Sequence, residues 1–167
     1  MAGHNKWSKI KRQKEKTDGQ KSRIFGKLVR MISVEAKIAQ GNPSSPGLKA
    51  AIEKAKAANV PNENIERAMK KATESGDNME SIVYESYGPG GCAMIISVLT
   101  TNRNKAAQEI KHILSQHNLE LAQIGSAAWA FEKHGSEWVP QTTISVSEED
   151  GEKLSLLIED LEENEEV

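Results

Sequence analysis

The sequence predicts an α+β protein in which an N-terminal three-helix domain with a basic arm is followed by an α+β sandwich. Two observations carry this prediction. Apolar residues recur at spacings of three and four through residues 20–76, which is the pattern of amphipathic helices. A polar, glycine-containing link then occupies 75–78, and strand-like apolar runs begin after it. We therefore expect a basic arm at 1–19, a three-helix domain at 20–76 and an α+β domain at 77–167.

The helical domain is expected to contain three short helices joined by tight turns. The first covers about residues 20–40 and is closed by Gly41, because glycine suits the position that follows a helix. The second begins at Pro46 with Ser45 as its N-cap, since proline is favoured in the first turn. The third covers about residues 62–76 and stops at a glycine.

The second domain is expected to contain elements in the order strand, strand, helix, strand, strand, helix. This order indicates helices on one face of an antiparallel or mixed sheet. The expected elements are strands at 82–87, 92–100, 127–133 and 138–146, a helix capped by Asn102, and a last helix that opens at Ser147.

Positive charge is concentrated at the N-terminus. Residues 1–30 hold ten of the 22 Lys and Arg residues against two acids, a net charge of +8, whereas the rest of the chain has 12 basic and 22 acidic residues. Such an asymmetry points to a polyanionic partner. A tryptophan inside the run offers a surface on which bases stack, and cations on an ordered helix are held in register with phosphates. The predicted nucleic-acid contacts are Lys6, Trp7, Lys9, Lys11, Arg12, Lys14, Lys16, Lys21, Arg23, Lys27 and Arg30.

A second anion site is predicted where the strand at 92–100 ends and the next helix begins. Backbone N–H groups and positive side chains converge at such a junction. An ordinary helix cap explains the same residues equally well. The side chains concerned are Asn102, Arg103, Asn104 and Lys105.

Negative charge gathers at the other end of the chain. Residues 148–167 hold ten acids against Lys153 alone. The simpler interpretation is a solvated helix face with a frayed end. The alternative is an internal competitor for the basic arm.

The residues give no support to other chemistries. Cys92 is the one cysteine, so no internal disulfide can form, which fits a reducing cytoplasm. The four histidines lack metal-ligand spacing, and no acid–base or nucleophile arrangement indicates catalysis. The glycine turn at 88–91 lacks the Lys-Ser or Lys-Thr of a phosphate loop. Neither a secretory signal nor an apolar run long enough for a membrane span is present. We expect a cytoplasmic, non-enzymatic protein without metal, cofactor or small-molecule substrate.

Four separated blocks of the sequence resemble the YebC/PmpR family, to which the mitochondrial translational activator of cytochrome oxidase also belongs. Together they extend over most of residues 1–133, and their order along the chain makes the resemblance specific. The blocks are MAGHNKW at 1–7, IFGKLVR at 24–30, YESYGPGG at 84–91, and TNRN at 101–104 followed by GSAAW at 125–129.

The resemblance implies a cytoplasmic probable transcriptional regulator that binds DNA. Other members resemble ribosome-associated translation factors, so ribosomal RNA is the alternative target, and a module that docks an acidic protein is a second alternative. The block at 84–91, with Tyr84 and Tyr87, is implied as a further contact region. The resemblance places the main contact on Lys6, Trp7, Lys9, Lys11, Arg12, Lys27 and Arg30.

The chain differs from the family pattern in its second half. Family members carry a third α/β domain after the segment that matches 131–135, whereas Trp138 follows almost at once here. We therefore expect a short form without that inserted domain. Relatives also continue beyond the position of Val167 into a final strand, so we expect the sheet to lack an edge. Target sequence, direction of regulation and oligomeric state stay open.

Overall fold

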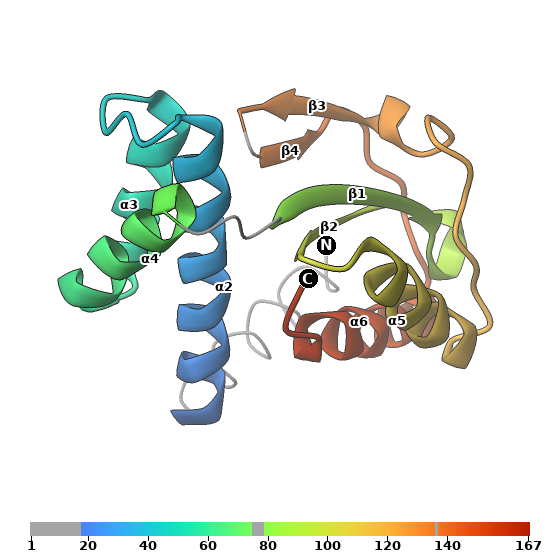
Figure 1. Ribbon diagram of the computed structural model, residues 1–167. Coiled ribbons are helices and arrows are strands. Elements are labelled where there is room, and N and C mark those ends of the chain that lie inside the picture. The colour runs from blue at the N-terminus through green and yellow to red at the C-terminus, as the bar shows by residue number, and fades with distance from the viewer. Residues whose placement is uncertain (1–17, 75–78, 136) are drawn as a thin grey trace.

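The computed structural model describes residues 18–74, 79–135 and 137–167, which form a helical part and an α+β part side by side (Figure 1). The predicted α+β class and the order of elements are confirmed. The helical part contains α2 (Asp18–Ile38), α3 (Pro46–Ala57) and α4 (Asn62–Glu74). The α+β part contains β1 (Glu80–Tyr87), β2 (Ala93–Thr100), α5 (Arg103–Gln116), β3 (Phe131–His134), β4 (Glu137–Pro140) and α6 (Glu148–Glu163), with short 3₁₀ turns η1 (Pro89–Gly91) and η2 (Ala128–Ala130).

The three helices of the first part enclose a small core of aliphatic residues and alanines. Ile32 on α2 and Leu48 on α3 are fully buried, and Ile65 on α4 is nearly so. The chain leaves α2 through Gly41, whose φ of 78° is the left-handed conformation expected of the residue that closes a helix. Ser45 occupies the predicted N-cap position of α3, but its side chain makes no capping hydrogen bond.

The second part is organised around the β1–β2 hairpin. The two strands pair antiparallel from Glu80 opposite Thr100 to Tyr87 opposite Ala93. Their turn places Gly90 and Gly91 at positive φ, which explains the glycine-rich sequence there. Helices α5 and α6 lie together on one side of the hairpin, and the β3–β4 hairpin lies on the other (Figure 1). The core of this part lies between β2 and the two helices α5 and α6. It is formed by Ile96, Val98, Ala106, Ile110, Leu114, Leu157 and Leu161.

Three expectations for the strands need correction. The third strand begins at Phe131 rather than 127, because the buried carboxylate of Glu85 accepts the N–H groups of Ala127 and Ala128 and a 3₁₀ turn forms. The fourth strand ends at Pro140 rather than 146, because its partner strand begins at Phe131 and the 3₁₀ turn at 128–130 offers no further strand to pair with. Within the described residues, the strands form two separate two-stranded sheets instead of one.

Candidate nucleic-acid interface

Of the predicted basic arm at 1–19, the structure describes only residues 18 and 19, which begin helix α2. Arm residues Lys6, Trp7, Lys9, Lys11, Arg12, Lys14 and Lys16 lie outside the described residues. Their role therefore stays a prediction. The other four predicted contacts lie on α2, where their surroundings are defined.

Helix α2 presents a row of cations on one face. Arg23, Lys27 and Arg30 are spaced by four and three residues, so their side chains lie one above another along the helix. Burial lowers the pKa of the Lys27 ammonium, the Glu162 carboxylate opposes this, and the charges of Arg23 and Arg30 lower it further. The three cations are thus close enough to influence one another. Lys21 is exposed on the preceding turn.

The C-terminal end of the chain lies against this row. Lys27 Nζ donates to the backbone oxygen of Glu162 at 2.7 Å, and Arg23 forms an ion pair with Glu163 at 3.8 Å. Arg30 donates to the backbone oxygen of Glu165 and to its carboxylate, the latter at 3.3 Å. Residues 162–165 are therefore docked on α2. Competition with the basic arm at 1–19 stays a prediction, because residues 1–17 lie outside the described residues.

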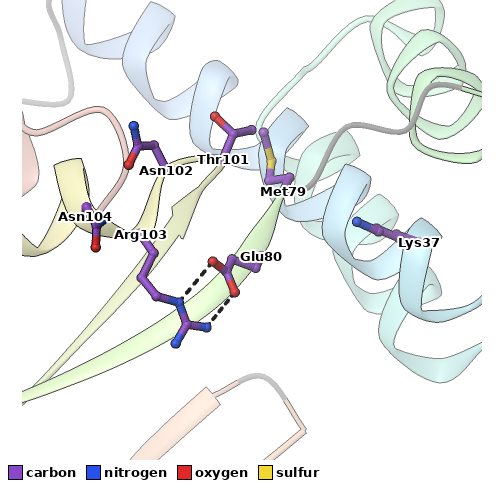
Figure 2. A pocket seen from close by; sticks show the side chains of 7 residues that line it. All are labelled: Lys37, Met79, Glu80, Thr101, Asn102, Arg103 and Asn104. Atoms are coloured by element: carbon purple, nitrogen blue, oxygen red, sulfur yellow. Dashed lines mark hydrogen bonds and ion pairs between the residues drawn. The ribbon is translucent and has the colours of Figure 1, made fainter.

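The predicted second anion site lies in an open pocket of about 600 Å³ between the start of β1, the start of α5 and α2 (Figure 2). Arg103 makes two hydrogen bonds to the Glu80 carboxylate, at 3.2 and 2.7 Å, and its hydrogen bond lowers the pKa of Glu80. The Asn102 side chain accepts the backbone N–H of Lys105 at 3.1 Å. These contacts favour the interpretation as a helix cap. The lining residues are Lys37, Met79, Glu80, Thr101, Asn102, Arg103 and Asn104.

The other residues of the predicted second contact are spread along the α+β part. Tyr84 is half-buried and packs against the core of the α+β part. Tyr87 lies at the far end of β1, where its hydroxyl donates to the Ser126 carbonyl and accepts from Trp129 Nε1 at 3.2 Å. Lys105 pairs with Glu109 at 3.5 Å. The structure therefore does not gather these residues into one surface with α2.

Sequence reasoning missed a cationic groove of about 510 Å³ between α2 and α4. Four basic residues line it, Arg30 and Lys37 from α2 and Arg67 and Lys71 from α4, and its described lining contains no acid. Apolar side chains such as Val29 complete the lining. The four-residue spacing on α4 is a sequence signal that could have indicated this cationic face.

The described part of the chain offers little to other functions. In residues 18–74, 79–135 and 137–167, no three His, Cys, Asp or Glu residues are placed to hold a metal ion. No helix among these residues is both long and apolar enough to cross a membrane.

Comparisons with known proteins agree with the sequence blocks. A family model for the TACO1/YebC protein N-terminal domain matches residues 5–75, and one for the TACO1/YebC second and third domain matches residues 79–136. A "probable transcriptional regulatory protein" from Petrotoga mobilis is 44% identical over 98% of this chain and 67% of its own length. The chain belongs to the TACO1/YebC family.

Other TACO1/YebC relatives give the same result. A protein of the same name from Fervidobacterium nodosum is 44% identical over all of this chain and 68% of its own length. The chain thus spans about two thirds of the length of these two relatives. The crystal structure of the conserved hypothetical protein Aq1575 from Aquifex aeolicus matches with a TM-score of 0.82 at 28% identity, over 92% of this chain and 89% of that one. The relatives' names support a regulator family and suggest a non-enzymatic role.

Proposed function

We propose that this TACO1/YebC protein binds nucleic acid and regulates gene expression, with the basic arm at 1–19 and the cationic face of α2 as its contact surface. The observation that carries the proposal is the row Arg23, Lys27 and Arg30, whose N–H groups hold oxygen atoms of acidic residues in this structure. Phosphate oxygens offer the same charge-assisted hydrogen bonds. Arginine forks suit phosphate particularly well.

Two further observations support a polyanionic ligand. The arm adds positive charge on the N-terminal side of α2, giving residues 1–30 a net charge of +8. The groove between α2 and α4 is lined by Arg30, Lys37, Arg67 and Lys71, of which Arg67 is paired with Glu63 at 2.6 Å and Arg30 with Glu165 at 3.3 Å. Several phosphates could therefore be neutralised at once, which is the main source of affinity for nucleic acids.

DNA is the preferred target, because the relatives are named probable transcriptional regulatory proteins. Ribosomal RNA is the alternative, since the same cations neutralise phosphates of either polymer. Base-specific recognition does not follow from this surface, because phosphate contacts position a protein without reading sequence.

The test is charge reversal of Lys9, Arg12 and Lys27 to glutamate, with binding to duplex DNA and to a ribosomal RNA fragment measured by fluorescence anisotropy. We expect affinity at low salt to fall on the order of 10- to 100-fold and the salt dependence to become shallower. If roughly 6 to 8 phosphates are neutralised in the unaltered protein, its log–log salt slope on duplex DNA is about −5 to −7.

A matched control reverses Lys49, Lys56 and Lys111, which are exposed lysines on α3 and α5. It makes the same change in net charge away from the proposed surface, and we expect a much smaller loss of affinity. Equal losses in the two variants, or unchanged affinity for both polymers, would overturn the proposal. Stronger binding to the RNA fragment than to DNA would identify ribosomal RNA as the target.

A further inference from the structure

The C-terminal acidic segment, residues 162–165, occupies the row of cations on which the proposed function depends. Lys27 and Arg30 donate to backbone oxygens of this segment, and Glu163 and Glu165 place carboxylates beside Arg23 and Arg30. The Arg30 side chain is only 27% exposed beneath its partner, whereas the Glu165 side chain is 77% exposed. The segment therefore lies over Arg30, while Arg23, with a side chain that is 42% exposed, is only flanked by it, and the acids of the segment face solvent.

The acidic segment is held in place by contacts with β2, α5 and the core of the α+β part. The backbone N–H of Leu99 on β2 donates to the Glu166 carbonyl at 2.7 Å. The Asn164 side chain donates to Glu109 on α5 at 2.8 Å. Val167 packs against the core of the α+β part. These anchors position residues 162–165 against α2, so the contact is not that of a free tail.

A phosphate backbone and the acidic segment would compete for the same three cations. The segment occupies some of the N–H donors of Lys27 and Arg30, and the carboxylates of Glu163 and Glu165 repel an approaching polyanion. We propose that residues 162–165 act as an internal competitor that masks the phosphate-binding row of α2 until nucleic acid displaces them. This inference rests on the proposed function, since it concerns the same cations.

The mask is expected to be displaceable. The ion pairs at Glu163 and Glu165 lie on the surface, and exposed pairs of this kind contribute little because water and salt screen them. Many phosphates acting together can outcompete these two pairs and the two hydrogen bonds that Lys27 and Arg30 donate to backbone oxygens. Removing both carboxylates should therefore raise affinity by roughly two- to tenfold rather than by orders of magnitude.

The experiment compares the unaltered protein with a Glu163→Gln, Glu165→Gln variant in binding to duplex DNA and to a ribosomal RNA fragment. Glutamine keeps the size of each side chain and removes its charge. The control variant, Glu53→Gln with Glu66→Gln, removes two charges from exposed positions on α3 and α4. Circular dichroism and thermal unfolding confirm that all three proteins are folded.

The proposal predicts tighter binding by the 163/165 variant and a clearly smaller gain in the control. Binding by the variant alone, with none by the unaltered protein, is the strongest form of the same result. If the unaltered protein binds and the variant gains no more than the control, the mask is wrong while the proposed function stands. If none of the three proteins binds either polymer, the proposed function fails and the mask fails with it.

Discussion

Glu85 is a charged residue in a buried position, only 6% exposed, and its carboxylate organises a loop. One oxygen accepts the N–H of Gly125 at 2.6 Å, and the other accepts those of Ala127 and Ala128 at 2.7 and 2.8 Å. Burial acts to raise the pKa of Glu85, but the three hydrogen bonds outweigh it and hold the pKa below its ordinary value. The ionised carboxylate thus replaces the strand neighbour that residues 127–128 lack.

Replacing Glu85 with glutamine should destabilise the protein by about 1–3 kcal/mol near neutral pH, because an NH₂ group then faces backbone donors and leaves them unpaired. Urea unfolding measures this loss. Because the folded pKa is depressed, the contribution of Glu85 is complete above its unfolded value of about 4.3 and disappears as pH falls through the folded value. The difference between the two proteins should therefore shrink in acid. A constant difference down to pH 3 would contradict this account.

At the level of single residues, the sequence predicted that the last predicted contacts lie on an ordered helix, which the structure confirms, but it did not indicate their partners. Their part in binding nucleic acid stays a prediction. Helical spacing alone puts Arg23, Lys27 and Arg30 on one face, and the structure agrees. No local pattern indicates that residues 162–165, some 135 positions further along, lie against them, because such contacts depend on the packing of whole elements. The same holds for Glu85, whose hydrogen-bond donors lie about 40 residues away.

Among the elements, α6 packs on the core of the α+β part, and its last residues, Glu162 and Glu163, begin the acidic segment. Leu157 is fully buried and Leu161 is 4% exposed, so one face of the helix packs against α5 and β2. Ser147 starts the helix by accepting the N–H of Asp150 at 3.1 Å, as the sequence predicted. The position of α6 in turn fixes where residues 162–165 meet α2.

Leu157→Ala should lower the free energy of unfolding by about 2–5 kcal/mol, since it leaves a cavity in the core. Leu156 provides a matched control on the same helix, because its side chain is 56% exposed. Leu156→Ala should change the free energy by no more than about 0.5 kcal/mol. Urea unfolding of both variants tests the assignment of the buried face. Similar losses in the two would contradict it.

Element boundaries were predictable where local signals are strong. Pro46, Asn102 and Ser147 mark helix starts that the structure confirms within a residue. The strand at 127–133 was too long in the prediction, because β-propensity does not reveal that Glu85 accepts the N–H groups of residues 127 and 128. The strand at 138–146 was too long because its partner begins only at Phe131. The periodicity of apolar residues likewise cannot tell one four-stranded sheet from two hairpins.

For the whole molecule, the two halves have separate cores, and α2 lies against both β2 and residues 162–165 of the second half. The described core cluster of the helical part draws on residues 25–72, and that of the α+β part on residues 84–167. Between them lie the contacts of α2 with residues 162–165 and an ion pair of Lys54 on α3 with Glu137 on β4. These charges are largely at the surface, so their attraction should depend on ionic strength.

High salt should therefore weaken the contact between the two halves without unfolding either half. Raising the ionic strength to about 1 M shortens the Debye length to roughly 3 Å and screens exposed pairs. We expect the radius of gyration from small-angle X-ray scattering to increase, while the circular dichroism spectrum stays the same because both cores persist. The Glu163→Gln, Glu165→Gln variant should expand at a lower salt concentration than the unaltered protein, because it keeps the backbone hydrogen bonds of Lys27 and Arg30 but lacks two ion pairs. The Glu53→Gln, Glu66→Gln control should expand at the same salt concentration as the unaltered protein. Superimposable scattering curves at low and high salt would mean that apolar packing, rather than charge, joins the halves, and the acidic segment would then be far harder to displace from α2.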